Sequence, residues 1–244
     1  MYNTKELERM YVGKTKDVYR LENGNLLLQF TNKTTMNDLG EEDPGGNKIG
    51  KEVAGSARAC ILMTQHFFKL FADAGIPTHL IGIDVENLQM EVKPVTTIGK
   101  ETFVNETGGV EWIWRNRFTG SFRKIFGRYN KNFKDGDIFS SPVIHATVKD
   151  DEAGDPYIEK DFMDALDILS GDDYDTLKGY TKVIGEILYA EFQKLGCDIW
   201  DFKVEYGRDR DGNLILIDEI GPGSARVYRD GKKMEKIEIG ELFG

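Results

Sequence analysis

The stretch Trp200-Asp-Phe-Lys-Val-Glu-Tyr-Gly207, followed by Leu214-Ile-Leu-Ile-Asp-Glu-Ile220, is the most informative part of this chain. In the first segment apolar and charged residues alternate strictly, which is the period at which side chains of a β-strand point to opposite faces. One face of the strand therefore carries Asp201, Lys203 and Glu205, and the other face packs into a core. The turn-forming residues that follow predict a hairpin, with the second segment as its return strand.

The register of this hairpin predicts a metal site. If Asp211-Gly212 is a two-residue turn, Glu205 lies directly opposite Asp218. Opposed carboxylates repel each other unless one is protonated or a cation lies between them. Oxygen ligands on a rigid hairpin suit Mg²⁺, which takes further ligands from water and substrate phosphates. The alternative is a solvent-facing strand with alternating charges, and a register shift of one residue would favour it.

Outward from the hairpin, the pattern predicts strands and helices without regular alternation. Strands are expected at residues 10–12, 18–21, 25–30, 78–83, 88–92 and 110–115, and helices at 51–73, 159–169 and 173–195. The Gly-rich, acidic segment 37–50 predicts a mobile functional loop, and residues 96–109 predict a hairpin. This order favours an α+β fold of two lobes around a cleft, with domains at 1–93 and 94–244.

Composition excludes several classes of protein. The 244 residues, 40% of them hydrophobic, can form a large core without disulfides, and Cys60 and Cys197 have no metal-binding spacing. A net charge of −10 disfavours a nucleic-acid partner. We find no apolar run long enough to cross a membrane and no signal peptide, so we expect no membrane partner and a cytoplasmic protein. A homodimer is left open.

Basic residues near turns are candidates for binding phosphate. A Gly-Lys-Thr-Lys turn carries Lys14 and Lys16 at a corner between strands, although a solvated turn is the commoner outcome. Arg115 precedes Ser121, where a short helix can begin, so a guanidinium, a hydroxyl and a helix N-terminus can converge on an anion. Arg226 follows the acidic hairpin and can join them. Taken singly, each arginine can equally be a surface residue.

Ordered along the chain, the motifs resemble one known family. They are Gly-Lys-x-Lys-x-Val-Tyr from Gly13, Ala-Gly-Ile-Pro-Thr from Ala74, the Arg-Asn pair at Arg115, Lys-x-Asp-x3-Asp-Pro from Lys149, Asp-x-Lys-x-Glu-x-Gly from Asp201 and Asp-Glu-Ile-x-Pro-x3-Arg from Asp218. Each motif is modest, but the ordered set, which spans essentially the whole chain, resembles the SAICAR synthetases, the phosphoribosylaminoimidazole-succinocarboxamide synthase family.

The resemblance implies a ligase that joins the imidazole nucleotide CAIR to L-aspartate while ATP becomes ADP and phosphate. It also implies a β-rich, distantly kinase-like N-terminal nucleotide lobe on a larger ATP-grasp-related C-terminal lobe. By motif, ATP would contact Lys14, Lys16 and Lys93; Mg²⁺ would be held by Glu205 and Asp218; the 5′-phosphate of the imidazole nucleotide would be bound by Arg115, Ser121 and Arg226; and the reacting groups would lie near Lys149, Asp201 and Lys203.

Three departures from the family pattern concern the substrate side. Gly223 and Lys33 stand where the family has acidic residues, Trp112 and Trp114 replace small aliphatic residues, and residues 96–108 look like added length. We therefore expect ATP use to persist more surely than the standard acceptor. The alternatives are a sister carboxylate–amine ligase with another acceptor, a small-molecule kinase, and a nucleotide-binding module without turnover.

Overall fold

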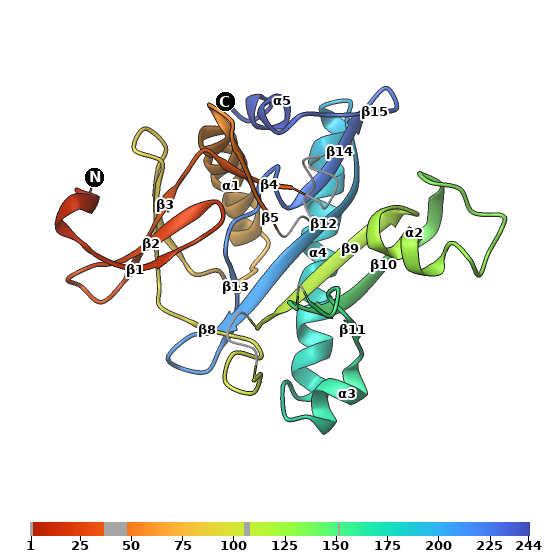
Figure 1. The fold of residues 1–244 in the computed structure, drawn as a ribbon, viewed down its shortest axis with the longest axis horizontal. Coiled ribbons are helices and arrows are strands. Elements are labelled where there is room, and N and C mark those ends of the chain that lie inside the picture. The colour runs from red at the N-terminus through yellow and green to blue at the C-terminus, as the bar shows by residue number, and fades with distance from the viewer. Residues whose placement is uncertain (1, 37–47, 105–107, 151) are drawn as a thin grey trace.

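The computed structural model describes residues 2–36, 48–104, 108–150 and 152–244. Its described strands form a five-stranded sheet, an eight-stranded sheet and a separate two-stranded hairpin (Figure 1). Neighbouring strands in these sheets pair antiparallel. The chain is therefore a mixed α/β protein built on antiparallel sheets, which confirms the coarse form of the α+β prediction.

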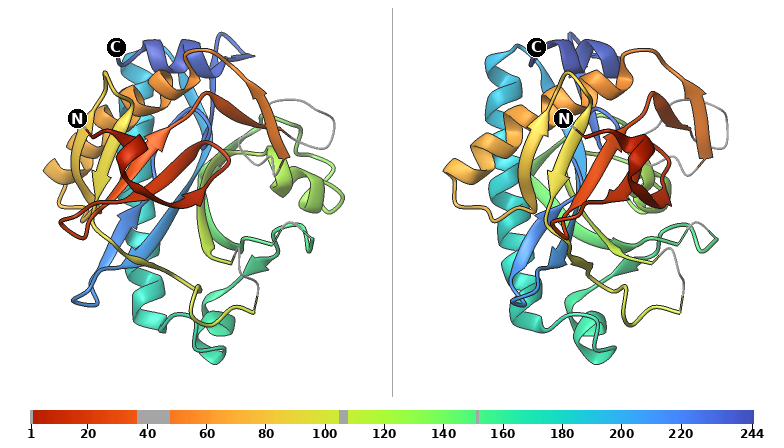
Figure 2. Two further views of the ribbon diagram at one scale, coloured as in Figure 1. Left: turned by 60° about the vertical axis from the view of Figure 1, so that its left-hand side comes forward. Right: turned by 90° about the vertical axis from the view of Figure 1, so that its left-hand side faces the viewer.

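The five-stranded sheet contains the predicted meander. After a short 3-10 helix (Thr4–Glu6), its order is β1-β2-β3-β7-β6, with bounds β1 Glu8–Val12, β2 Lys16–Arg20, β3 Leu26–Phe30, β6 Leu80–Asp84 and β7 Gln89–Val92. Buried residues of β3 and β7, such as Leu28 and Met90, pack into the main hydrophobic core. Figure 2 shows β1 to β3, in red and orange, lying in front of the blue C-terminal strands when the molecule is turned.

Helix α1 (Ser56–Asp73) begins later than predicted. Lys51 and Glu52 belong instead to β5 (Lys48–Glu52), which pairs with β4 (Lys33–Met36). Gly55, with φ 91°, then turns the chain into the helix. One face of the helix is buried, because Ala57, Ile61, Thr64, Phe68 and Phe71 all lie in the interior. The predicted loop at 37–50 lies mostly outside the described residues, and its end belongs to β5.

The larger sheet holds the hairpin that the sequence singled out. Its order is β11-β10-β9-β12-β14-β15, and both β13 and β8 also pair with β12. The bounds are β8 Thr96–Thr97, β9 Val110–Arg117, β10 Ile138–Val148, β11 Tyr157–Ile158, β12 Asp198–Arg208, β13 Leu214–Ile217, β14 Ala225–Arg229 and β15 Lys232–Lys233. A hairpin was expected at residues 96–109. Instead, Thr96 and Thr97 form β8, which pairs with β12 of this sheet.

One face of the larger sheet packs against the long helix α4 (Gly171–Lys194), as Figure 1 shows. Trp112 contacts Tyr174, and Trp114 lies against Gly185, where an added Cβ would come within 2.4 Å of the indole. Both tryptophans are almost completely buried. The expectation that they alter the substrate side is therefore wrong, because they lie on the core face of the sheet.

The remaining helices are short. They are α2 (Gly120–Phe126), α3 (Lys160–Ala165) and α5 (Lys236–Glu241). Helix α5 packs closely on α1, where Gly240 meets Ala59. Among the residues that the structure describes, we find no helix that combines the length and apolar character needed to span a bilayer.

Candidate active site

The face of the larger sheet opposite α4 is polar, and we call it the polar face. Residues directly opposite each other on neighbouring strands share a face. Asp201 of β12 lies opposite Arg115 of β9 and Arg226 of β14, while Glu205 lies opposite Glu111. Lys203 lies between Asp201 and Glu205 on the same side. The predicted alternation along β12 therefore places its three charged residues together.

One end of the polar face, the arginine end, is formed by Arg115, Ser121, Asp201 and Arg226. Arg115 pairs with the carboxylate of Asp201, which also accepts from Arg226 at 2.7 Å. The second Nη of Arg115 donates to Ser121 Oγ at 3.1 Å. Two guanidinium groups share the carboxylate of Asp201, and guanidinium groups are the donors that bind an anion best.

Gly120 explains how α2 comes so close to these arginines. Its φ of 62° lies in the left-handed region, and an added Cβ would lie 2.9 Å from Arg226 and 3.1 Å from Arg115. A side chain at this position would therefore displace one of the guanidinium groups. Glycine lets the start of α2 bring Ser121 into contact with Arg115.

The middle of the polar face alternates acids with lysines. Lys203 Nζ lies 2.6 Å from Glu111 Oε1, and Lys149 Nζ lies 2.7 Å from Glu205 Oε1. Burial raises the pKa of Glu205, and the nearby carboxylates of Asp218 and Glu111 add to that effect against Lys149. Burial also acts to raise the pKa of Glu111, but Lys203 and Lys149 outweigh it and hold that pKa below its usual range. The two acids are thus held in different electrostatic environments.

The predicted register of the hairpin is wrong by one residue. Glu205 lies opposite Ile217, because the turn has three residues between Asp209 and Asn213, with Gly212 at φ 83°. A left-handed glycine after a tight turn is the usual form of a three-residue hairpin loop. Asp218 is therefore not the cross-strand partner of Glu205.

Asp218 nevertheless acts on the same site, because the chain leaves the strand at this residue. Its φ is 66°, and its negative charge adds to the raised pKa of Glu205 and opposes the lysines that lower the pKa of Glu111. Asp218 and its neighbour Glu219 both form ion pairs with Lys16 of β2. A local left-handed turn thus offsets the register shift and connects the carboxylates to the five-stranded sheet.

Two surrounding histidines are buried. His79 Nε2 lies 3.0 Å from the carbonyl oxygen of Asp218, and burial lowers the pKa of His79 to about 4. His145 Nε2 lies 3.2 Å from Arg115 Nε, and burial, with the positive charge of Arg115, lowers the pKa of His145 to about 3. His79 is therefore a buried packing residue, and its hydrogen bond also supports the backbone at Asp218.

Two of the predicted ATP contacts, Lys14 and Lys93, are exposed. Lys14 is exposed in the turn between β1 and β2. Lys93 is exposed just after β7, and its charge, after the hydrogen bonds from Asn213, helps to lower the pKa of Asp209 in the hairpin turn. Of the three predicted lysines, only Lys16 forms a described ion pair with Asp218.

Sequence reasoning missed three residues of the site, and two of them had a signal. Glu111 has the same parity as Arg115 in β9, so it had to share the face of that arginine. Glu219 follows Asp218 directly, and both meet Lys16. His145 gave no such signal, because its contact with Arg115 depends on how β10 pairs with β9.

Four carboxylates could offer oxygen ligands to Mg²⁺, and we call them, with their lysine partners, the carboxylate end of the polar face: Glu111, Glu205, Asp218 and Glu219. Among the residues that the structure describes, we find no group of three or more acidic, histidine or cysteine side chains that could hold a metal ion by itself. Mg²⁺ often takes only one or two protein carboxylates and completes its shell with water and phosphate oxygens. The donor set at Glu205 and Asp218 therefore fits a nucleotide-bound magnesium ion.

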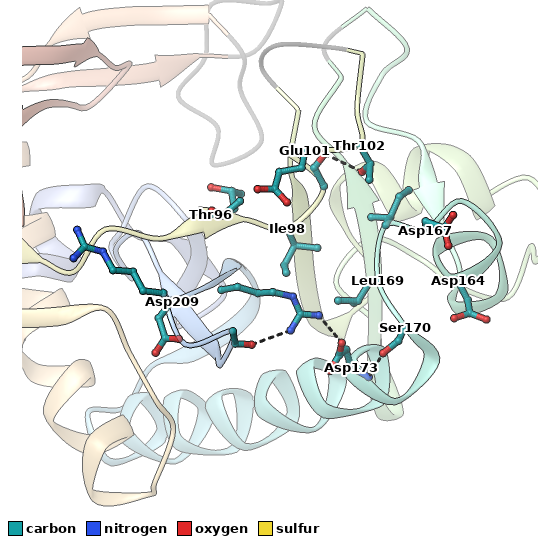
Figure 3. A pocket seen from close by; sticks show the side chains of 16 residues that line it. Thr96, Ile98, Glu101, Thr102, Asp164, Asp167, Leu169, Ser170, Asp173 and Asp209 are labelled. Atoms are coloured by element: carbon teal, nitrogen blue, oxygen red, sulfur yellow. Dashed lines mark hydrogen bonds and ion pairs between the residues drawn. The ribbon is translucent and has the colours of Figure 1, made fainter.

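A pocket of about 540 Å³ lies away from these residues. It is bordered by β8, by the turn from α3 to α4 and by the β12–β13 turn, and an ion pair between Arg208 and Asp173 crosses it (Figure 3). None of the predicted site residues lines this pocket. The clustering of charges, rather than cavity size, identifies the candidate site.

Comparison with known proteins gives a consistent result. The SAICAR synthetase family matches residues 9–238. Phosphoribosylaminoimidazole-succinocarboxamide synthase from Clostridium tetani is 42% identical over 235 residues, covering 96% of this chain and 98% of the relative. The enzyme of that name from Finegoldia magna is 30% identical over 233 residues, covering 94% and 90%.

Solved structures share the fold. The phosphoribosylaminoimidazole-succinocarboxamide synthase of Ehrlichia chaffeensis matches with a TM-score of 0.79 at 25% identity, covering 97% of this chain and 92% of that one. A SAICAR synthetase solved in complex with ADP also matches with a TM-score of 0.79, at 24% identity, covering 95% and 94%. From the match over nearly its whole length and the identity to its relatives, the chain belongs to the SAICAR synthetase family.

Proposed function

We propose that this chain is a magnesium-dependent ligase that joins CAIR and L-aspartate to give SAICAR, with ATP converted to ADP and phosphate in purine biosynthesis. The proposal rests on family membership. One observation carries it: three kinds of charged group follow one another along the polar face of β12. Two arginines pair with Asp201, Lys203 comes next, and Glu205 follows. Four residues of strand separate the two ends by about 13 Å.

That spacing suits a nucleotide bound along the strand. The 5′-phosphate lies at the arginine end, where Arg115, Ser121 and Arg226 can donate hydrogen bonds to it. The imidazole carboxylate then extends toward Lys203, and the γ-phosphate of ATP enters from the carboxylate end. Lys16, Lys14 and Lys93 are proposed to bind the phosphates of ATP.

The chemistry requires activation of a carboxylate, which is a poor acyl donor. A carboxylate oxygen of CAIR attacks the γ-phosphorus of ATP, and the bond to the ADP oxygen breaks. The amine of aspartate then attacks the acyl phosphate, an amide bond forms, and phosphate leaves with the former carboxylate oxygen. Lys203 and Lys149 stabilise the negative charge that develops, while Asp201 holds the arginines.

Mg²⁺, when bound, would neutralise charge on the transferring phosphoryl group. Glu205 and Asp218 are the residues that we propose to hold it. Their lysine partners, Lys149 and Lys16, act to lower the pKa values of these carboxylates and are themselves suited to contact phosphate oxygens. No protein nucleophile is needed in this scheme.

We also propose that the two sheets mark two lobes, residues 1–93 and 94–244, with a cleft between them where ATP binds. A kinase-like first lobe and an ATP-grasp-related second lobe are consistent with the separate sheets. The solved relative that carries ADP supports nucleotide binding by this fold. We extend the proposal to a cytoplasmic enzyme that acts on small molecules and can form a homodimer.

An oxygen-labelling experiment tests the reaction. Purified protein is incubated with ATP, magnesium, aspartate and CAIR whose carboxylate carries ¹⁸O, and parallel reactions omit CAIR or aspartate. We expect ADP release that requires both substrates, and one ¹⁸O atom in each phosphate released. ADP formation that does not depend on CAIR, or phosphate without label, would contradict the proposal.

A different acceptor is the second candidate, and Gly223 favours it. A Cβ at Gly223 would meet no atom within 4 Å, so a larger residue would fit and the loss of the carboxylate has no steric cause. The labelling assay with other imidazole or pyrimidine carboxylates distinguishes the two candidates. A stable phosphorylated product formed without any amine would instead indicate a kinase.

A further inference from the structure

Arg115 is oriented by the protein before any ligand is bound. It is 3% exposed, and its Nη1 contacts Asp201 and the carbonyl oxygen of Thr119, the latter at 3.4 Å. Its Nη2 donates to Ser121, and its Nε donates to His145 Nε2 at 3.2 Å. Of the five hydrogens on a guanidinium, four thus have partners among the described residues, which leaves one on Nη2 for a ligand.

The contact with Arg115 fixes the tautomer of His145. The Nε of an arginine always carries a hydrogen and can only donate, so His145 Nε2 must accept and the imidazole proton lies on Nδ1. His79 has the opposite arrangement, because its Nε2 faces a carbonyl oxygen, which can only accept. The two buried histidines are therefore expected to carry their imidazole protons on different nitrogens, and each is a reference for the tautomer of the other.

Neighbouring strands lock the ring of His145 in this orientation. His145 lies opposite Ile113, two residue pairs along from the Val143–Arg115 pair, so its side chain is on the same face of the sheet as Arg115. The ring of Tyr157 stacks on the imidazole with centroids 4.5 Å apart and planes 23° apart. His145 is 7% exposed, so water cannot readily replace its contact with Arg115.

Charge explains why a histidine suits this position. Asp201 already neutralises one of the two guanidinium groups at the arginine end. A carboxylate at position 145 would orient Arg115 but would add a negative charge beside the guanidinium groups. A neutral imidazole orients the guanidinium without adding that charge.

From these contacts we infer that His145 is a positioning residue, whose neutral Nε2 holds the Arg115 guanidinium in the rotation that binds the 5′-phosphate of the nucleotide substrate. The inference rests on the proposed function for the identity of that phosphate. It differs from the proposed roles of Arg115, Ser121 and Arg226, because His145 acts through Arg115 and does not touch the ligand.

Nitrogen NMR of the histidine side chains tests the tautomer without any turnover. The chain has three histidines, so the variants His145→Gln and His79→Gln assign their signals. We expect His145 to carry its proton on Nδ1 and to stay neutral at pH 6, and His79 to carry its proton on Nε2. A protonated Nε2 at His145 would overturn the inference.

A binding experiment tests the consequence, with ribose 5-phosphate as the probe and ribose as its uncharged control. His145→Leu keeps an apolar side chain of similar bulk but removes the acceptor, whereas His145→Gln retains a neutral acceptor. We expect the Kd for ribose 5-phosphate to rise about tenfold in the leucine variant and to stay within about threefold in the glutamine variant. His66→Leu, on α1, controls for loss of an imidazole elsewhere.

Unchanged affinity in His145→Leu, or equal weakening by leucine and glutamine, would show that His145 acts only as a packing residue and would refute the inference. If the leucine variant does not fold, the glutamine variant and the NMR measurement still decide the question. Because neither measurement requires ligase turnover, a failure here is distinguishable from a failure of the proposed reaction.

Discussion

The two ends of the polar face are built in different ways. At the arginine end, Arg115, Asp201 and Arg226 come from three adjacent strands and lie directly opposite one another in the sheet. At the carboxylate end, Glu205 comes from a strand, but Asp218 comes from a left-handed residue just beyond one. Backbone hydrogen bonds therefore fix the first group, whereas the second depends on a local turn and on Lys16 from the other sheet.

This difference suggests a division of labour. At the arginine end Arg115 and Asp201 are buried, each about 4% exposed in their side chains, although Ser121 beside them is exposed. Asp218 has a side chain that is 34% exposed. A rigidly held arginine suits the recognition of one substrate, and a more exposed carboxylate suits a nucleotide and its metal ion, which enter and leave in each cycle.

The largest expected effect is at the carboxylate end. Asp218→Asn keeps the size of the side chain, and asparagine tolerates the left-handed backbone. It removes the charge proposed to hold Mg²⁺, so we expect kcat to fall by about 1,000-fold, which corresponds to ~4 kcal/mol. Steady-state kinetics across a magnesium titration measure this, with circular dichroism to check the fold.

Asp211→Asn is the matched control for this change, because Asp211 is exposed in the turn of the same hairpin. It should retain wild-type activity. Normal magnesium-dependent turnover in Asp218→Asn would remove the basis for the proposed metal site.

A smaller effect is expected at the arginine end. Arg115→Lys keeps the positive charge but loses the planar set of donors that contacts Asp201, Ser121 and His145. We expect kcat/KM for the imidazole nucleotide to fall about 10- to 100-fold, while KM for ATP changes little. Initial-rate kinetics with each substrate varied in turn separate the two parameters.

Arg117→Lys is a suitable control on the same strand, since Arg117 pairs with Asp198 and lies over the ring of Trp200. Equal effects of the two substitutions would show that β9 needs its arginines for packing rather than for substrate binding.

The sequence predicts those features of the site that depend on neighbouring residues, and it fails where a feature depends on how distant segments pair. Alternation along β12 is local, so it placed Asp201, Lys203 and Glu205 on one face correctly. The register across the hairpin depends on turn length, and a three-residue loop with Gly212 replaced the expected two-residue one. The left-handed φ of Asp218, which alternation could not reveal, then takes the chain out of the strand at the residue whose charge acts on Glu205.

The core side of the same sheet shows the same limit. Trp112 and Trp114 were obvious in the sequence, yet their partners on α4, Tyr174 and Gly185, lie more than sixty residues away. Without that contact the tryptophans could be assigned to either side of the sheet. Strand parity places both tryptophans on the face opposite Arg115, because even and odd positions point in opposite directions, but only the contact with α4 shows that this face is the core.

On the core face of the larger sheet, substitutions in α4 should change stability and leave activity unchanged. In Gly185→Ala the new Cβ would lie 2.4 Å from the indole of Trp114, so we expect a loss of ~1–3 kcal/mol in the free energy of unfolding. Gly179→Ala, on the same helix with no atom within 4 Å, should instead stabilise by ~0.5–1 kcal/mol. Urea unfolding measures both, and kcat should be unchanged in each while the protein is folded.

The smallest effect concerns pH and returns to the arginine end. The folded state keeps His145 neutral, with its pKa lowered to about 3, whereas the unfolded chain protonates it below about pH 6.5. The unfolded state then binds more protons, so the free energy of unfolding should fall by up to ~1.4 kcal/mol per pH unit from this residue as pH decreases from 6.5.

His145→Gln should remove that part of the slope between pH 6.5 and 5.5 in urea titrations. His66→Gln, whose side chain is 37% exposed, is the comparison for removing an imidazole. An identical slope in wild type and His145→Gln would mean that the imidazole beside Arg115 can be protonated in the folded protein, and the arginine end would then gain positive charge in acid instead of losing stability.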